Sequence, residues 1–321
     1  MDWITNLANI FLGQMKFLFL SEDSRLWWGW ILLTYPVLGM FVGFIEMRRA
    51  KEPITAKGLW QFVFPATIYK SASFRNDILI VLALYIGYSL ILGLFSNLEA
   101  KSIIGKLIEA SKSDTITNSF AGPYKGTVPA SLPVHLFFTF LVIVAYDFGF
   151  TMLHFAFHRV PFLWNLHKVH HSAEHLTPLT VARFHLGEYV LQKISEGFTL
   201  GLIFGIFFYL LPESINIYKV FGLSIFGILF SSIGVFRHSH IWISYGPLNS
   251  IFCSPAMHQI HHSTEARHLD KNFSQIFSIW DRLLGSLYLP KGREKFNVGL
   301  ADEKDWNNGS WKKFMGIHLK G

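Results

Sequence analysis

Histidine is concentrated in one part of this sequence, at spacings that would let its side chains bind metal. Of 15 histidines, 13 lie between His154 and His268. Two segments share one form, His-Lys-Val-His-His at 167–171 and His-Gln-Ile-His-His at 258–262. Residues at i, i+3 and i+4 share one side of a helix, so each segment directs its imidazoles to one region. Imidazole binds iron, zinc, copper and nickel. The number of histidines exceeds the four ligands of a structural zinc site and suits two adjacent ions.

Further histidines extend this set. His154 and His158 are four residues apart at the end of an apolar stretch, which predicts one helix face. His238 and His240 are two residues apart and point to different sides of a helix. We expect His238 to bind metal, and the spacing leaves His240 open. The candidate metal ligands are His154, His158, His167, His170, His171, His185, His238, His240, His258, His261 and His262.

Supporting roles are expected for a few other residues of this region. His185 could bind metal or pair with Glu188. Asp147 lies seven residues before the first candidate ligand, where its carboxylate could accept the second N–H of a ligating imidazole. Asn272 and Asp281 interrupt an aromatic stretch and could do the same, or could cap helices and form turns. The single cysteine excludes an internal disulfide and a thiolate zinc site.

The composition is that of a membrane protein. The chain of 321 residues is 51% hydrophobic and 15% charged, against about 25% charged in an average soluble domain. Uncharged apolar stretches cover residues 27–44, 78–97, 134–154, 197–211 and 215–236. About 20 residues cross the hydrocarbon core, so 197–211 is short and could be tilted or form half of a re-entrant hairpin. We predict an all-α fold, a polytopic integral membrane helical bundle with a histidine-rich helical cap that holds a di-metal site.

The distribution of charge predicts an orientation. A net charge of +7 could indicate nucleic-acid binding, but the positive residues lie in short loops beside apolar stretches, as in the positive-inside pattern. Arg48, Arg49, Lys51 and Lys57 follow the first stretch, so we expect that loop to be cytoplasmic. Counting spans from there places every histidine cluster on the cytoplasmic face. The membrane is that of bacteria (inner) or the endoplasmic reticulum.

Three regions are expected along the chain. Residues 1–133 would supply an amphipathic N-terminal helix at 1–20 and membrane anchors, with a polar loop at 99–132 on the non-cytoplasmic side. Residues 134–290 contain the candidate chemistry. Residues 291–321 form a charged amphipathic tail.

The order of the histidine motifs resembles the fatty acid hydroxylase and sterol desaturase superfamily of membrane di-iron oxygenases. The resemblance covers residues 134–290, and its third histidine region and later segments are similar to alkylglycerol monooxygenases and bacterial lipid hydroxylases. One departure is the close spacing of His238 and His240, where many members space two histidines more widely. Besides the histidines, the motifs that carry the resemblance are Asp147-Phe-Gly, His170-His-Ser, Gly246-Pro-Leu, His261-His-Ser-Thr, Asp270-Lys-Asn-Phe and Trp280-Asp-Arg-Leu-Leu-Gly.

This resemblance implies an O₂-dependent enzyme. Two iron ions, which zinc could replace during purification, would use O₂ and two electrons to hydroxylate an unactivated C–H of a membrane lipid. The metal cluster would be the oxidant, so no side chain is assigned as catalytic. The sequence has no fused cytochrome b5 motif of the form His-Pro-Gly-Gly, so the electrons are expected from a separate cytochrome b5 or ferredoxin-type protein.

Other readings of the same site stay open. The first is a lipid desaturase with the same metal site. A membrane metal transporter would place its ligands near the bilayer midplane, whereas these lie at span ends. A zinc hydrolase would need few histidines and one open coordination position. The sequence does not decide between fatty acyl, sterol and ether lipid substrates, and it leaves the oligomeric state open.

Overall fold

The structure, a computed structural model, describes residues 22–96, 128–129, 131–210, 213–214, 219–220, 223–224 and 234–301. Several sequence-based expectations fall on other residues. These are the amphipathic helix at 1–20, most of the polar loop at 99–132, most of the apolar stretch at 215–236 and the larger part of the tail at 291–321.

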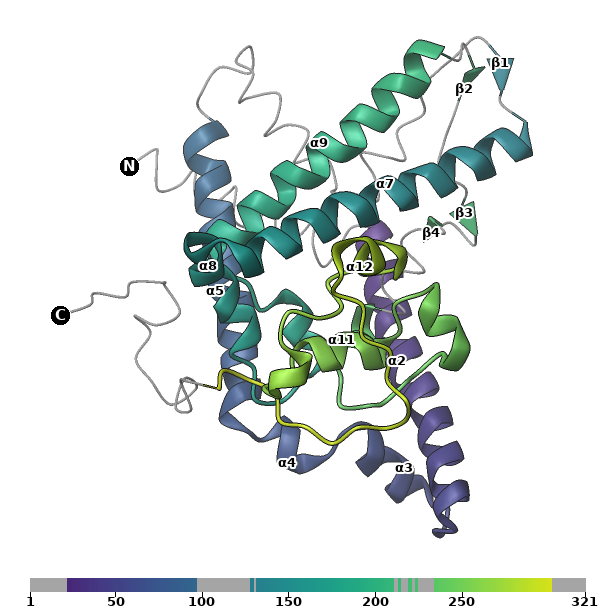
Figure 1. Ribbon diagram of the computed structural model, residues 1–321, viewed down its shortest axis with the longest axis vertical. Helices are drawn as coiled ribbons and strands as arrows, with labels where there is room; N and C mark the ends of the chain where they lie inside the picture. Colours follow the sequence, from purple (N-terminus) through teal and green to yellow (C-terminus); the bar gives the residue numbers. More distant parts are fainter. Residues whose placement is uncertain are drawn as a thin grey trace, which may run out of the picture.

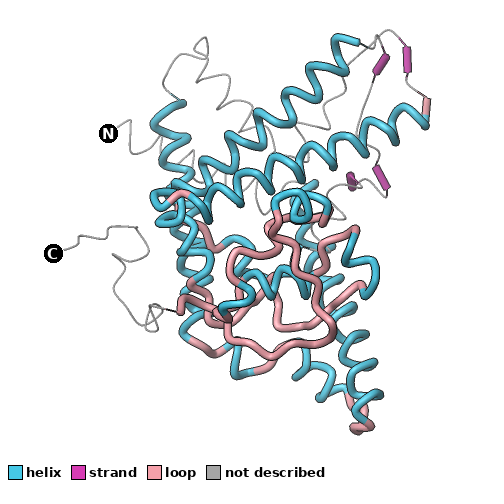
Figure 2. The backbone as a smooth tube through the Cα atoms, viewed as in Figure 1, coloured by secondary structure: helices cyan, strands magenta, loops and turns pink. Residues whose placement is uncertain are grey.

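Helices make up most of the described chain (Figures 1 and 2). Four long ones, α2 (Glu22–Ala50), α5 (Ala72–Ser96), α7 (Leu132–Arg159) and α9 (Leu186–Leu210), contain four of the predicted apolar stretches. The all-α class predicted from the sequence is confirmed. The shorter helices are α3 (Ala56–Val63), α4 (Ala66–Tyr69), α8 (Pro161–His171), α11 (Pro255–His261) and α12 (Ile279–Leu284), with 3-10 turns η1 (Pro178–Ala182), η2 (Gly246–Ser250) and η3 (Ala266–His268).

The described strands are four two-residue segments. β1 (Val128–Pro129) pairs in parallel with β2 (Glu213–Ser214), and β3 (Lys219–Val220) pairs antiparallel with β4 (Leu223–Ser224). Figure 1 shows them at the ends of the long helices, away from α11. They connect segments and do not form a sheet layer.

One helix of the described chain, α7, is both long and apolar enough to cross a membrane. Its 28 residues would rise about 42 Å at 1.5 Å per residue, more than the roughly 30 Å of a hydrocarbon core. The sequence predicted more spans than this single helix.

Helices α7 and α9 lie side by side (Figure 1) and pack together through a buried apolar cluster. Phe138 of α7 meets Phe204 of α9 edge to face, with ring centroids 4.9 Å apart, and Leu200 is fully buried beside them. Gly149 permits this close approach, because a Cβ at that position would collide with the side chain of Thr199. The packing fixes where the C-terminal end of α7 lies relative to the N-terminal end of α9.

Prolines set the boundaries of the helices that carry histidines. Val160 is extended because Pro161 disfavours a helical conformation in the residue before it, so α7 ends there. Pro161 then starts α8, because proline is favoured in the first turn of a helix. Pro255 starts α11 in the same way. Ser254 occupies the N-cap position of α11, but its side chain makes no capping hydrogen bond.

A buried ion pair joins α5 to the segment between α8 and α9. Arg183 donates from Nη1 to Oδ1 of Asp77 at 2.6 Å, and both side chains are fully buried. Thr177 and Thr180 donate their hydroxyls to the other carboxylate oxygen, at 2.9 and 2.8 Å. Arg183 also donates from Nε to the carbonyl of Val169 in α8 at 3.0 Å. This network therefore fastens the helix that carries three candidate ligands to the N-terminal half of the chain.

We predict that Asp77→Ala destabilises the protein strongly. The substitution leaves the Arg183 guanidinium buried without its carboxylate, which costs about 3–5 kcal/mol. Denaturant unfolding in detergent measures this loss. Arg49→Ala is the control, because Arg49 pairs with Glu46 on the surface and exposed pairs contribute about 0–1 kcal/mol. Equal effects of the two substitutions would contradict the prediction.

Candidate metal centre

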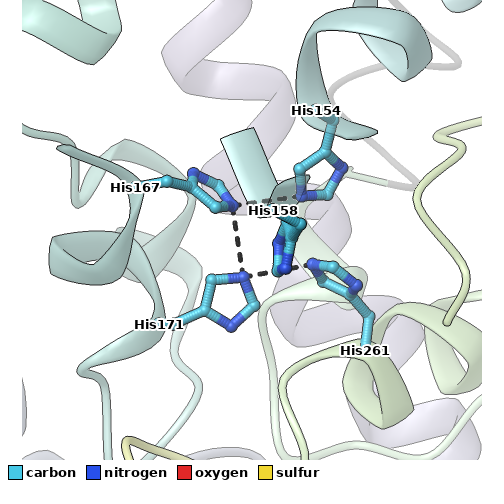
Figure 3. A group of neighbouring side chains, drawn as sticks. All are labelled: His154, His158, His167, His171 and His261. Carbon is cyan, nitrogen blue, oxygen red and sulfur yellow. Dashed lines mark hydrogen bonds between the residues drawn. The ribbon is translucent and has the colours of Figure 1, made fainter. Parts of the chain in front are cut away.

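Nine of the eleven candidate histidines converge into two adjacent groups. Within each group, one ring nitrogen from every histidine lies within 4.8 Å of the others. The rings of His171 and His262, from different groups, have centroids 4.5 Å apart, so the groups adjoin. The five-histidine group, shown in Figure 3, is His154, His158, His167, His171 and His261. The four-histidine group is His170, His238, His258 and His262.

Helix geometry explains how each His-x-x-His-His segment serves both groups. At 3.6 residues per turn, position i+4 lies about 40° from position i, and position i+3 lies about 60° to the other side. In α8, His167 and His171 therefore join the five-histidine group and His170 joins the four-histidine group. The second segment does the reverse. His261, at position i+3, joins the five-histidine group, and His258 and His262, at positions i and i+4, join the four-histidine group.

The distances between ring nitrogens fit bound metal ions. Neighbouring Nε2 atoms are 3.1–3.2 Å apart in the five-histidine group, the contacts dashed in Figure 3. They are 2.9–3.3 Å apart in the four-histidine group. Two imidazole nitrogens at about 2.0–2.1 Å from one metal ion lie about 2.9–3.4 Å apart, at angles from square to tetrahedral. The side chains are therefore spaced as ligands of a common ion.

The hydrogen bonds of His154 and His261 show which nitrogen of each ring carries the proton. The other nitrogen, which faces the centre of the group, is free to bind a metal ion. Nδ1 of His154 lies 2.7 Å from the carbonyl of Phe273, and Nδ1 of His261 lies 2.8 Å from the carbonyl of Lys271. A carbonyl only accepts, so each Nδ1 carries the proton and each Nε2 has a free lone pair. Such lone pairs repel when they converge, and a cation between them removes the repulsion. The donor set thus fits a metal ion.

Burial keeps these rings neutral. It lowers the pKa of His170 to about 3 and that of His261 to about 4, because a charged imidazolium loses its hydration in the interior. The rings of both groups are therefore neutral at pH 7. A metal can bind them without displacing a proton, since neutral imidazole is the form that ligates.

Glu188 lies beside a candidate ligand, His167, and not beside His185, the partner that the sequence offered as one alternative. Its fully buried carboxylate accepts from Nδ1 of His167 at 2.7 Å, and Gln192 donates to the same oxygen at 3.1 Å. A carboxylate behind a ligating histidine orients the ring and raises its basicity. The signal in the sequence was an acid in the first turn of an apolar helix. His185 lies outside both groups, because its Nδ1 turns back to accept from the main-chain N–H of Gly187 at 3.0 Å.

His240 also lies outside both groups. Its Nε2 is 2.7 Å from the carbonyl of Phe62 near the end of α3. His238 points into the four-histidine group instead. The two-residue spacing predicted that these rings would diverge, and the contact with α3 shows where the second one goes.

Asp147 accepts hydrogen bonds from main-chain N–H groups. Among the described residues, it makes no hydrogen bond to a histidine ring. The expectation that it supports a ligand directly is therefore wrong. Its carboxylate accepts from the main-chain N–H groups of Gln275, Ile276 and Phe277 at 2.7–3.1 Å and from the indole of Trp280 at 3.0 Å. A carboxylate seven residues before His154 faces the loop after α11, because that loop covers this side of α7.

Asp281 and Asn272 also act on the main chain around the groups. Asp281 accepts from the main-chain N–H of Phe273 at 2.6 Å. Because the carbonyl of Phe273 accepts from His154, Asp281 positions that acceptor and touches no ligand itself. Asn272 adopts a positive φ of 56° and donates to the carbonyl of Met257 at 3.1 Å, which ties its turn to α11. Both residues position backbone that carries or contacts the candidate ligands, and neither forms a hydrogen bond with a ligand ring.

Comparison with known proteins agrees with this geometry. A family model described as fatty acid hydroxylase matches residues 139–286. Ornithine lipid hydroxylase OlsE of Rhizobium tropici is 29% identical over 165 residues, 50% of this chain and 45% of that protein. Alkylglycerol monooxygenase of Danio rerio is 29% identical over 147 residues, 46% of this chain and 29% of that protein. A probable Δ(7)-sterol 5(6)-desaturase of Neurospora crassa is 30% identical over 184 residues, 55% of this chain and 44% of that protein.

Residues 139–286 are therefore similar to the fatty acid hydroxylase family, and the resemblance inferred from the histidine motifs is confirmed. The two histidine groups fit the histidine boxes of this family. The matched segments cover less than half the length of these relatives. No solved structure gives a significant match.

We predict that Glu188→Gln weakens metal binding about 10–100-fold, the usual effect of removing a carboxylate behind a ligating histidine. Zinc titration of metal-free protein against a chelating dye measures the change. Glu196→Gln is the matched control, since Glu196 lies two turns further along α9 and pairs with Lys193. Unchanged zinc affinity in Glu188→Gln would remove Glu188 from the site.

We also predict that the metal-free protein loses stability as pH falls below about 6.5, the usual pKa of histidine. The folded-state pKa values of His170 and His261 are about 3 and 4, so between these values and 6.5 only the unfolded chain binds the protons. Each such histidine then costs about 1.4 kcal/mol per pH unit. Thermal unfolding after chelation, from pH 7.5 to 5.5, should show a falling Tm, and His261→Asn should reduce the slope. A constant Tm would contradict this.

Proposed function

We propose that this chain is an O₂-dependent di-iron oxygenase that hydroxylates an unactivated C–H of a membrane lipid. The observation that carries the proposal is the pair of adjacent, buried, all-imidazole groups within a fatty acid hydroxylase region. Relatives named as an ornithine lipid hydroxylase and an alkylglycerol monooxygenase support a lipid as the substrate. The proposed partners are the lipid itself and a separate electron-donor protein of the cytochrome b5 or ferredoxin type.

Iron is proposed because the chemistry needs a redox metal. Imidazole sets also accept zinc, which has no redox chemistry. Two bound iron ions would supply the electron-transfer steps that allow one oxygen of O₂ to enter a C–H bond while the other leaves as water. Neutral ligands leave the charge of the ions uncompensated. Glu188, 2.7 Å from His167, and Asp270, 3.6 Å from Nδ1 of His158, offset part of it.

The protein's own contribution is to hold the imidazoles and to keep water away from the reacting C–H. Phe157 stacks on His167 with centroids 5.2 Å apart and planes 10° apart, and Phe184 stacks on His170 at 5.3 Å. Phe273 lies edge-on to the rings of the five-histidine group and is fully buried. These aromatic contacts restrict ring rotation and line the site with apolar surface, which favours a hydrocarbon over water.

A membrane location is proposed from the outer surfaces of α7 and α9. Both helices expose large apolar side chains that would be costly in water, where contiguous apolar patches are small. The most exposed large apolar residues of these helices are Leu132, Phe137 and Phe140 on α7, and Ile194, Phe198 and Leu202 on α9. Lipid contact accounts for them. The positive residues after α2 favour histidine groups on the cytoplasmic side.

A small pocket between α7 and α9 lies close to the five-histidine group. Its wall includes Phe150, whose ring lies 5.4 Å from that of His154, and Gln192, which hydrogen-bonds Glu188. We propose that part of the lipid chain enters along this contact. The lining residues are Tyr146, Phe150, Leu153, Gln192, Ser195, Glu196 and Thr199.

Desaturation by the same site is the second candidate, because one relative is named as a probable sterol desaturase. Both reactions begin with removal of hydrogen from an unactivated C–H. They differ in whether oxygen is added or a second hydrogen is lost. Mass spectrometry of the lipid product separates them, as an increase of one oxygen or a loss of two hydrogens.

The test is metal content and O₂ uptake of detergent-purified, iron-reconstituted protein with a reductant and total membrane lipid. We expect about two irons per chain and lipid-dependent O₂ uptake. His170→Ala and His261→Ala should each lower the metal content and abolish uptake. His240→Ala should retain both, because its ring lies outside the groups. Two zinc ions without uptake after iron reconstitution would favour a hydrolase, and metal without any lipid chemistry would favour a transporter.

A further inference from the structure

We infer that the two histidine groups bind metal with unequal affinity. The five-histidine group loads first and retains its ion, and the four-histidine group loads second and releases its ion first. This rests on the proposed function only in that both groups bind metal. The reason lies in what contacts the far side of each ring.

In the five-histidine group, three of the nitrogens that face away from the centre have hydrogen-bond acceptors, and a fourth lies near a carboxylate. His154 and His261 donate from Nδ1 to main-chain carbonyls at 2.7 and 2.8 Å. His167 contacts the buried carboxylate of Glu188 at 2.7 Å, and His158 lies 3.6 Å from a carboxylate oxygen of Asp270. Such partners fix the ring orientation and make the inward nitrogen a stronger donor to metal.

The four-histidine group lacks these partners. Its members are His170, His238, His258 and His262, and Nδ1 of every one is buried without a hydrogen-bond partner among the described residues. Main-chain groups of Arg183 and Gly234 lie near two of the rings, His170 and His238, and hydrogen-bond them weakly at most. His258 and His262 are therefore held by packing alone, and no strong acceptor supports the other two rings.

Charge acts in the same direction. The buried guanidinium of Arg237 acts electrostatically on two rings of the four-histidine group, His238 and His258, and on one ring of the other group, His154. Only the five-histidine group has carboxylates of the described chain beside its rings, those of Glu188 and Asp270. It also offers one more ligand. Ligand number, hydrogen-bond support and charge thus all favour metal binding at the five-histidine group.

The expected difference in affinity is at least about 10–100-fold, the usual effect of hydrogen-bond partners behind ligating histidines. Two adjacent cations also repel each other, so the second ion would bind more weakly even to identical sites. The inference therefore requires that the wild-type protein binds its two ions in separate steps. Such steps alone do not identify which group binds the first ion. Substitutions that remove one ligand from one group at a time make that assignment.

The chain offers adjacent residues as matched pairs. His261 belongs to the five-histidine group and His262 to the four-histidine group. In the first helix, His171 and His170 have the same relation. Both members of a pair lie on the same helix turn, so damage to that turn would affect them alike. A difference between them reports on the group from which the ligand was removed.

The experiment is zinc titration of metal-free, full-length protein against a chelating dye, with total zinc counted after gel filtration. Wild type should bind two ions, the first about 10–100-fold more tightly. His262→Ala and His170→Ala should keep the tight step within about threefold of wild type and lose the weak one. His261→Ala and His171→Ala should lose the tight step. Glu188→Gln should weaken the tight step alone.

Two results would overturn the inference. One is that both variants of a pair, for example His261→Ala and His262→Ala, lose the tight binding step equally. This result counts when both variants unfold thermally like the His240→Ala protein. The other is loss of the tight step in the His262→Ala protein alone. If adjacent variants fail to fold, chelator treatment of the zinc-loaded Glu188→Gln protein decides, since it should lose its two ions at more similar rates than wild type. Failure of wild type to bind any metal would instead reject the proposed function.

Discussion

The structure depends on bringing imidazole lone pairs together in an interior that offers them no water. Each ring must stay neutral, must turn one nitrogen inward and must find room for the other nitrogen. Rings arranged in this way repel one another until a cation lies between them. The surrounding fold therefore has to provide the free energy that keeps them in place. That requirement explains why so many buried polar contacts around the site fasten backbone rather than touch a ligand.

Three buried carboxylates show how this is done. Asp77 fastens α8 to α5 through Arg183, Asp147 holds the main chain after Phe273, and Asp281 sets the turn that contains Phe273. The first two join segments more than one hundred residues apart in the sequence. Glu188 differs from them because it contacts a candidate ligand ring directly. The N-terminal half, which has no candidate ligand, therefore still takes part in shaping the metal centre.

Local spacing made part of this predictable from the sequence. The i, i+3, i+4 pattern predicted which residues of α8 and α11 face the site, and apolar runs predicted the long helices. Spacing could not decide whether His185 and His240 bind metal, since their rings form hydrogen bonds with the main chain of Gly187 and Phe62. Asp147 was placed on the correct side of α7, but its partners come from a loop 128 or more residues away. Long-range main-chain acceptors leave no pattern in a sequence.

The interleaving of the two groups on α8 and α11 has a mechanical consequence. Each of these helices contributes to both ion positions, so the separation between the positions is set by the pitch of a helix turn rather than by a flexible loop. A rotation of either helix would move one position inward and the other outward. The same two helices thus fix the location of both ion positions. Insertion of one residue into either segment would therefore misplace ligands of both ions at once.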